Sequence, residues 1–285
     1  MNNLNIDFVR LGKYVTWSSL IFILATFYAL FSGHFEKGID FTGGIIIEGT
    51  GHNNIIDTKK LETNLNEANV TNYTIQLFSK EHDFILRLQD SNDINIVNKI
   101  KNIFKPYNFE YLKIEKIGSQ MSKQAINQGV LALTMALLGI MIYLWCRFNW
   151  KFGIAGIITL IHDFILTIGA FMILQYNANI STIAAILTII GYSTNDSVVI
   201  FDRIRDNMYK AIPFRQKINI SINSTLSRTF LTSFTTLISI LPMIFLGISE
   251  VREFCVIIFI GIIIGTYSSI FISAPALIIL KTDKL

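Results

Sequence analysis

The chain has 285 residues, of which 52% are hydrophobic and 15% are charged, and its formal net charge is +4. Its mean hydropathy of +0.50 is typical of a protein that lies largely in lipid, and it excludes most soluble classes. The basic residues are dispersed along the chain, so the positive charge does not indicate a nucleic-acid partner.

Six apolar runs are long enough to cross a bilayer, because a spanning helix needs roughly 17–25 mostly apolar residues. They lie at Tyr14–Phe31, Gly129–Trp145, Phe152–Leu174, Ile180–Ile200, Phe230–Leu246 and Phe254–Leu280. The first run has a long core and no small-residue cleavage site, so we interpret it as a retained anchor over residues 14–31. The last is long enough to tilt, or to break near Pro275.

The basic residues also predict the orientation of these spans. If the N-terminus is cytoplasmic, the inner segments hold nearly all the lysines and arginines near the spans, and the short outer loops contribute only Arg252. A bias of this kind sets orientation. We therefore expect cytoplasmic segments at 1–13, 202–228 and 281–285, with five of the spans within 126–280. The segment 202–228 is expected to be a loop with an amphipathic stretch on the membrane surface through Ile222.

The outer segment, residues 32–125, changes from continuous to patterned hydrophobicity. Alternation predicts strands over Phe41–Glu48, Tyr73–Phe78, Phe84–Leu88 and Tyr111–Ile117, with a turn at Lys80–Asp83. Helical spacing predicts helices over Asp57–Ala68 and Ile94–Phe104, with Asp57 and Asp93 as caps. The order β-α-β-β-α-β is that of a small ferredoxin-like α+β domain. Gly43 and Gly44 lack the spacing of a phosphate-binding loop, so we expect a bend there.

Ionisable side chains inside the spans are the candidates for a mechanism, because a carboxylate at the bilayer centre costs about 2.5–3.5 kcal/mol on insertion scales. Asp163 lies in the middle of the third span beside His162, and Asp196 lies in the cytoplasmic half of the fourth. Arg228 opens the fifth span on the same side as Asp196, so the two can pair between neighbouring helices. A pair that opens when Asp196 takes up a proton would be a switch, whereas a permanently closed pair would be structural.

Helical spacing adds detail to two of these spans. Tyr192, Asn195 and Asp196 fall at i, i+3 and i+4, which predicts one polar face on the fourth span. Gly261 and Gly265 have the GxxxG spacing that allows close helix packing in the sixth. His162 is either a second titrating group or a hydrogen-bonded structural residue.

Several motifs together resemble one family. The segment Gly38-Ile39-Asp40-Phe41-Thr42-Gly43-Gly44 is similar to the shared signature of the SecD/SecF family of the bacterial Sec protein-export machinery. The fourth-span motif looks like the SecF branch of that family, and it includes Gly191, Tyr192, Asn195, Asp196, Asp202 and Arg203. Thr225–Thr229 and Gly265–Ser269 also fit this branch. The resemblance runs from the first span to about Lys281.

The resemblance implies a helical membrane protein of the resistance–nodulation–division superfamily, in the bacterial inner membrane, with both termini cytoplasmic. It implies SecD, YajC, the SecYEG channel, unfolded precursor proteins and membrane lipid as partners, and no nucleic acid. The family is thought to use the proton-motive force in late steps of export, with protons as the coupling ion and no cofactor, metal or catalytic residue. By position, Asp196 and Arg228 match the family's proton-pathway pair, and Asp163 matches an acidic position in the third span.

Other functions remain open at the level of sequence. A small-molecule exporter of the same superfamily usually carries two large exported domains and twice the spans. A structural subunit that does not couple to an ion is a second alternative. An intramembrane serine protease built on Ser193 and His162 is a third, but the sequence offers no oxyanion arrangement for it. Coupling to sodium rather than protons also stays open.

Overall fold

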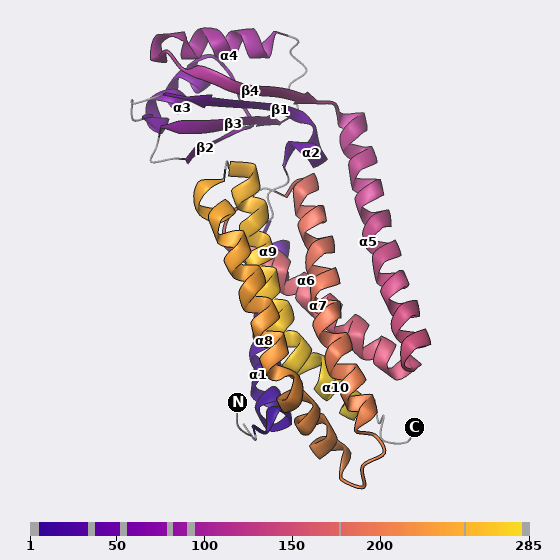
Figure 1. Ribbon diagram of the computed structural model, residues 1–285. Coiled ribbons are helices and arrows are strands. Elements are labelled where there is room, and N and C mark those ends of the chain that lie inside the picture. The colour runs from indigo at the N-terminus through magenta and orange to yellow at the C-terminus, as the bar shows by residue number, and fades with distance from the viewer. Residues whose placement is uncertain are drawn as a thin grey trace. The chain divides into compact units, whose positions relative to one another are not determined.

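The computed structural model describes residues 6–33, 38–51, 56–78, 82–89, 95–176, 178–247 and 249–280 (Figure 1). The chain divides into two compact units. We call Lys37–Val130 with Asn177–Ile180 the sheet unit. The helical unit comprises Met1–Glu36, Leu131–Tyr176 and Ser181–Leu285.

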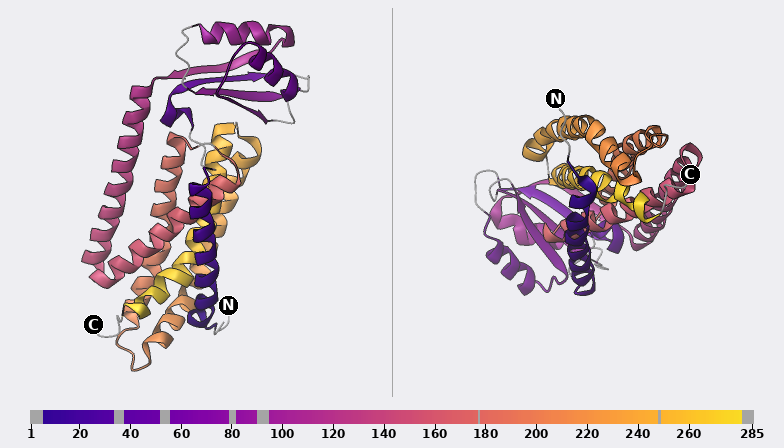
Figure 2. Two further views of the ribbon diagram at one scale, coloured as in Figure 1. Left: turned by 180° about the vertical axis from the view of Figure 1, so that it is seen from behind. Right: turned by 90° about the horizontal axis from the view of Figure 1, so that it is seen from below.

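Six helical segments among the described residues are long and apolar enough to cross a membrane, which confirms the six predicted spans. The first five are α1 (Phe8–Phe31), α5 (Ser119–Arg147), α6 (Trp150–Ile173), α7 (Ile180–Asp206) and α8 (Phe214–Leu246). The sixth begins in α9 (Ser249–Ser268). Within the helical unit, α1 packs against α6 and the end of the sixth span, and α9 packs against both α6 and α8 (Figure 2).

The sixth span is interrupted near Pro275, which is one of the two outcomes that its length allows. A π-helical turn, η3 (Ser269–Ser273), separates α9 from the short helix α10 (Ala274–Ile279). Pro275 lies at the start of α10, where its missing N–H and its ring disrupt the regular hydrogen-bond ladder of the turn before it. The helix is therefore wider for one π-helical turn, and the α-helix then resumes at Ala274.

The prediction of a loop over 202–228 is wrong in its extent. α7 continues to Asp206 and α8 begins at Phe214, so only residues 207–213 connect them. The 33 residues of α8 rise about 50 Å at 1.5 Å per residue. Its first turns are not a separate surface helix, because Ile218 and Ile222 are fully buried in the main apolar core with residues of α1, α7 and α10. Packing against these helices places the amphipathic stretch in the core.

Hydrogen bonds hold the start of α1 against the first turns of α8. The Asp7 carboxylate caps α1 and accepts hydrogen bonds from the side chains of Asn219 and Arg215, both at 2.8 Å. The Asn219 bond is the main reason why the pKa of Asp7 lies below its usual value. Asn223 pairs with both the N–H and the carbonyl of Ile6, at 3.2 and 2.9 Å. These contacts join segments more than 200 positions apart in the chain.

The sheet unit contains an antiparallel sheet with the strand order β2-β3-β1-β4. Its strands are β1 (Gly44–Thr50), β2 (Tyr73–Phe78), β3 (Asp83–Gln89) and β4 (Glu110–Ile117). Helix α3 (Thr58–Glu67) follows β1, and α4 (Ile96–Phe104) follows β3. The sequence of strands and longer helices is the predicted one. Asp57 caps α3 as expected, while Asp93 and most of the expected turn at Lys80–Asp83 lie outside the described residues.

The first strand starts later than alternation predicts. A short helix, α2 (Ile39–Thr42), takes up Phe41, and β1 begins at Gly44. Gly43 and Gly44 have φ angles of +79° and +146°, which side chains other than glycine rarely adopt. The glycine pair therefore makes the expected bend at the strand entry. A second short helix, η2 (Lys105–Tyr107), lies between α4 and β4.

The core of the sheet unit lies between α3, α4 and one face of the sheet. Its fully buried members include Ile47, Leu61, Leu65, Leu86, Ile100 and Phe104. The Phe104 ring meets Phe84 and Phe109 edge-on, with centroids 5.5 and 5.7 Å away. On β4, by contrast, the alternating apolar residues Leu112 and Ile114 are 61% and 37% exposed. The apolar stripe of β4 is therefore a surface feature and not part of this core.

We expect Phe104→Ala to destabilise the sheet unit by about 3–5 kcal/mol, because it removes a buried ring and leaves a cavity beside Phe84. The measurement is urea-dependent protease resistance of this unit in the full-length protein in membranes. Leu112→Ala is the matched control, since its side chain is exposed. Equal resistance of both variants would contradict the assigned core.

Candidate functional site

Asp163 lies in α6 with its side chain fully buried (0% exposed). Its Oδ2 accepts hydrogen bonds from the hydroxyls of Ser193 on α7, at 2.5 Å, and Ser268 on α9, at 2.9 Å. Its Oδ1 lies 2.9 Å from Nδ1 of His162, the preceding residue. A buried carboxylate is costly unless it is hydrogen-bonded, and here donors from three helices meet at one side chain.

The hydrogen bonds continue from His162 to α9 and α1. His162 Nε2 lies 3.2 Å from the hydroxyl of Tyr267, and the two rings meet edge-on with centroids 5.7 Å apart. The same hydroxyl lies 3.2 Å from Oγ of Ser19. We call these connected side chains the Asp163 network: Ser19, His162, Asp163, Ser193, Tyr267 and Ser268.

Two glycines of α9 allow the close approach that this network needs. A Cβ atom at Gly265 would lie 2.9 Å from Cβ of Ser193, and one at Gly261 would overlap the side chain of Ile189. Both contacts are with α7. The predicted packing glycines therefore lie where α9 meets α7, at the level of the Ser193 hydroxyl that binds Asp163.

Asp196 lies one turn after Ser193 on α7, and its surroundings differ from those of Asp163. It is 2% exposed, and its Oδ2 has no hydrogen-bond partner among the residues that the structure describes. The expected pair with Arg228 is not closed: Arg228 is exposed, and no salt bridge or hydrogen bond joins its side chain to Asp196 in the described part of the chain. The next residue of α8, Thr229, is 1% exposed.

The other residues of the fourth-span motif differ in their contacts. The Tyr192 hydroxyl donates to Ser233 on α8, at 3.2 Å, and Ser233 is 2.7 Å from the Thr266 hydroxyl on α9. Asn195 and Gly191 are exposed. Of the three residues with this spacing, Asn195 is exposed, whereas Tyr192 contacts α8 and Asp196 is buried.

The charged end of α7 joins neighbouring helices. Asp202 accepts from Arg147 at the end of α5, at 2.9 Å, and from Arg205, at 2.7 Å. Arg203 donates to Ser224 on α8, at 3.1 Å. These exposed contacts orient the helix ends, and pairs of this kind contribute little to stability.

The signature residues at the start of the sheet unit shape the backbone through hydrogen bonds and a bend. The N–H of Gly38 donates to the carbonyl of Ala178, at 2.7 Å, and a Cβ at Gly38 would overlap that carbonyl. Asp40 Oδ2 accepts from the N–H of Ile180, at 2.9 Å, which is the first residue of α7. An acidic side chain is a favoured partner for a free N–H group at a helix start. Phe41 lies in α2, and Gly43 and Gly44 make the bend described above.

Ser193 and His162 do not form a nucleophile–base pair. The Ser193 hydroxyl donates to Asp163, and His162 contacts Asp163 and Tyr267. Within the described residues, no hydrogen bond joins Ser193 to His162. Acyl transfer by serine needs that contact, so the arrangement gives no support to the protease alternative.

The sequence alone does not single out Tyr267 as the partner of His162, or Ser19 as the partner of Tyr267. Ser19 and Tyr267 lie in apolar runs, and the residues around Tyr267 indicate only close helix packing and a family motif. One general signal was available, since a buried tyrosine hydroxyl in a span usually has a hydrogen-bond partner. Which partner it has depends on how α1, α6 and α9 pack.

These features define a polytopic helical membrane protein with buried carboxylates and a small α/β unit between its first two spans. A family described as protein export membrane protein SecD/SecF, C-terminal, matches residues 96–283. The chain is 43% identical over 291 residues to protein translocase subunit SecF of Rickettsia bellii (strain OSU 85-389), covering 99% of this chain and 96% of that protein. The SecF subunit of Rickettsia felis is 42% identical, with 99% and 94% covered. The chain belongs to the SecD/SecF family.

Solved structures agree with this assignment. The crystal structure of SecDF, a translocon-associated membrane protein from Thermus thermophilus, has a TM-score of 0.89 at 33% identity over 99% of this chain. A structure of SecDF in a super-membrane-facing form has a TM-score of 0.72 at 32% identity. This chain spans 40% and 39% of the length of those two chains. Its function is that of a protein translocase subunit of the SecF kind.

We expect Gly261→Leu to destabilise the helical unit by about 1–3 kcal/mol, because the new side chain overlaps Ile189 and separates α9 from α7. The measurement is the midpoint of thermal unfolding of the purified protein in detergent. Gly139→Leu on α5 is the control, since nothing lies within 4 Å of a Cβ atom there. A midpoint for Gly261→Leu equal to that of the control would contradict close packing at this position.

Proposed function

We propose that this protein couples the proton-motive force to late steps of protein export, as an accessory subunit of the Sec translocase acting with SecD. The observation that carries the proposal is Asp196, a carboxylate buried in a membrane-spanning helix with an oxygen that has no hydrogen-bond partner in the described part of the chain. Such a group is expensive in lipid unless it binds a proton or faces a pathway.

Asp196 and Arg228 are the proposed coupling pair. An ionised Asp196 attracts the Arg228 guanidinium on α8, and a protonated Asp196 does not. One elementary charge crossing the membrane potential is worth about 2.3 kcal/mol per 100 mV. Proton binding at Asp196 would therefore change the attraction between α7 and α8, and the potential would supply the free energy. The proposed cycle consists of proton binding and helix movement without chemical conversion of a substrate, as we expect of a subunit that is not an enzyme.

The proposed architecture is six helices of the resistance–nodulation–division type with a ferredoxin-like sheet unit. The strand order β2-β3-β1-β4, all antiparallel, supports it. In that order α3 and α4 each connect two strands that lie either side of a third, which is the split βαβ arrangement. We place both termini in the cytoplasm of a bacterial inner membrane and the sheet unit outside, on the distribution of basic residues.

The proposed partners are SecD, YajC, the SecYEG channel and unfolded precursor proteins. SecD is the partner best supported, because the SecDF chain that this protein matches is more than twice as long. The helical unit has apolar side chains that are more than 40% exposed and available to lipid or to partner helices, such as Phe22, Trp145, Phe230 and Phe234.

We expect Asp196→Asn and Arg228→Ala each to abolish stimulation of export by an imposed proton gradient, because either change removes the charge difference that protonation controls. The measurement is completion of translocation of a model precursor into inverted vesicles that contain the whole translocase. The controls are Asp206→Asn and Arg10→Ala, which remove exposed charges from the ends of α7 and α1.

Wild-type export rates in both test variants, with normal membrane insertion, would end the coupling proposal. A loss that occurs equally in the controls would indicate a general effect of charge removal at the membrane surface.

We also expect the sheet unit to contact precursors through its β4 edge. β4 lies at an edge of the sheet and carries the exposed Leu112 and Ile114, and an edge strand can bind an extended chain by adding a strand. A photoreactive residue at Leu112 should crosslink to a precursor arrested in translocation, whereas one at Lys59, exposed on α3, should not. Capture at Lys59 but not at Leu112 would place the contact elsewhere.

A further inference from the structure

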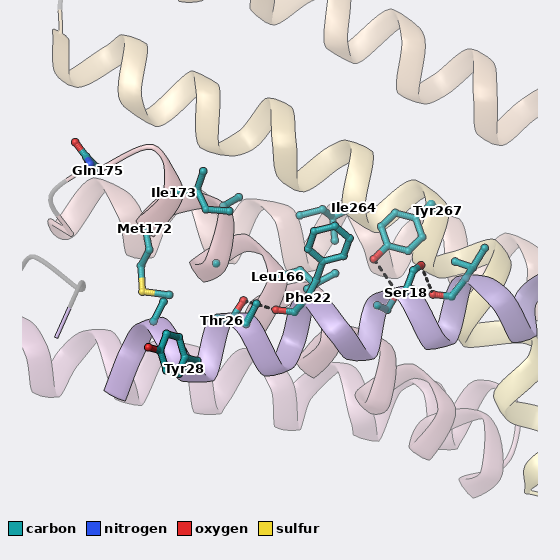
Figure 3. A pocket seen from close by; sticks show the side chains of 16 residues that line it. Ser18, Phe22, Thr26, Tyr28, Leu166, Met172, Ile173, Gln175, Ile264 and Tyr267 are labelled. Atoms are coloured by element: carbon teal, nitrogen blue, oxygen red, sulfur yellow. Dashed lines mark hydrogen bonds between the residues drawn. The ribbon is translucent and has the colours of Figure 1, made fainter. Parts of the chain in front are cut away.

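A groove of about 770 Å³ lies between α1, α6 and α9 in the helical unit. Its walls are mostly apolar, with Phe22 from α1, Leu166 and Met172 from α6, and Ile264 from α9 (Figure 3). The volume exceeds the roughly 30 Å³ that one water occupies, but apolar cavities stay dry, so water in the groove would be held at its hydroxyls. The same wall also carries Ser19 and Tyr267, which belong to the Asp163 network.

The hydroxyls in this groove are of two kinds. Ser18 and Thr26 donate to carbonyls of their own helix, those of Val15 and Phe22, at 2.8 and 2.9 Å. Hydroxyls satisfied in this way are common packing features of membrane helices. Ser19 and Tyr267 instead bond to each other between α1 and α9, and Tyr267 continues to His162. They connect the groove with the buried carboxylate.

The hydrogen bonds can be assigned a direction when Asp163 is ionised. A carboxylate only accepts, so His162 Nδ1 carries the proton that faces Oδ1, and its Nε2 must accept. Tyr267 then donates its O–H to Nε2, and the Ser19 hydroxyl donates to the Tyr267 oxygen. Every donor along the line points toward Asp163. Among the described residues that contact the pair, Tyr267 is the titratable side chain from another helix, and α7 contributes Ser193.

We propose that Ser19, Tyr267 and His162 form a proton relay from the groove to Asp163. This proposal rests on the proposed proton coupling and adds a route to the second buried acid. A hydronium ion in the groove gives a proton to Ser19 Oγ, and the Ser19 hydroxyl proton passes to the Tyr267 oxygen. The Tyr267 proton passes to His162 Nε2, and the Nδ1 proton passes to Asp163 Oδ1. One proton enters, one water is left, and the network changes from a charge of −1 to neutral.

The relay gives distinct roles to neighbouring groups. Ser193 and Ser268 donate to the other carboxylate oxygen, Oδ2, so they hold Asp163 in place without lying on the route. His162 serves as both acceptor and donor through its two ring nitrogens, which suits the transfer of a proton between two partners. Tyr267 is the residue whose hydroxyl the route requires and whose ring contact with His162 survives without it.

The test uses Tyr267→Phe, which removes one hydroxyl oxygen and keeps the ring. The protein, in complex with its SecD partner, is reconstituted in lipid vesicles and transferred to D₂O buffer acidic enough to protonate Asp163, and the infrared band of the protonated Asp163 carboxyl is followed. Its assignment comes from its loss in Asp163→Asn. We expect hydrogen–deuterium exchange of this carboxyl to slow by about 10²-fold, the lower end of what a positioned proton-transfer group contributes.

Tyr28→Phe is the matched control. Tyr28 also lines the groove, but its hydroxyl makes no hydrogen bond within the described residues, so exchange should keep its wild-type rate. Ser19→Ala is the second test variant, and it should slow exchange in the same direction as Tyr267→Phe. If Tyr267→Phe does not assemble, Ser19→Ala tests the relay on its own.

Wild-type exchange in Tyr267→Phe, or in Ser19→Ala where the first variant is not obtained, would overturn the relay. A lower thermal unfolding midpoint with unchanged exchange would do the same, because it would show a purely structural network. Failure of the relay is separable from failure of the coupling proposal. If Asp196→Asn abolishes gradient-driven export while Tyr267→Phe exchanges at the wild-type rate, only the relay is lost.

Discussion

A carboxylate buried among apolar helices must receive hydrogen bonds, and the helical unit is arranged so that Asp163 receives them. Ser193 and Ser268 reach it from α7 and α9, and they do so because Gly265 lets the backbone of α9 approach Ser193. Leaving a buried polar group unsatisfied costs about 1–3 kcal/mol, and more when it is charged. The rotation and spacing of α6, α7 and α9 are therefore tied to this one side chain, and Tyr267 extends the constraint to α1 through Ser19.

The two buried acids have opposite environments. Asp163 is bonded through both of its oxygens, whereas Asp196, one turn beyond Ser193 on α7, has an oxygen without a partner in the described residues. A fully hydrogen-bonded carboxylate stabilises one arrangement of the helices. A carboxylate with an unpaired oxygen is stabilised by any event that supplies a proton or a hydrogen-bond donor. The first group holds α6, α7 and α9 together, and the second is able to respond to a proton or to the movement of Arg228.

Small residues and short polar contacts shape the signature at the start of the sheet unit. Gly38 and Asp40 bond to the backbone just before and at the start of α7, and Gly43 and Gly44 turn the chain into β1. These residues shape the backbone and carry no chemistry of their own. The exposed apolar residues of β4 are the part of the sheet unit that the fold leaves available to another chain.

The number of spans, the order of strands and the positions of the buried acids follow from the sequence, because run length, alternation and residue spacing are local properties of the chain. Partners across helices do not follow from it. The rotation of each helix is set by side-chain packing, which leaves Arg228 exposed with Thr229 buried and brings Tyr267 to His162. The same packing buries Ile218 and Ile222 in what local pattern predicts as a surface stretch. Tertiary structure alone decided that the Asp196–Arg228 pair is open and that Asp163 is the bonded centre.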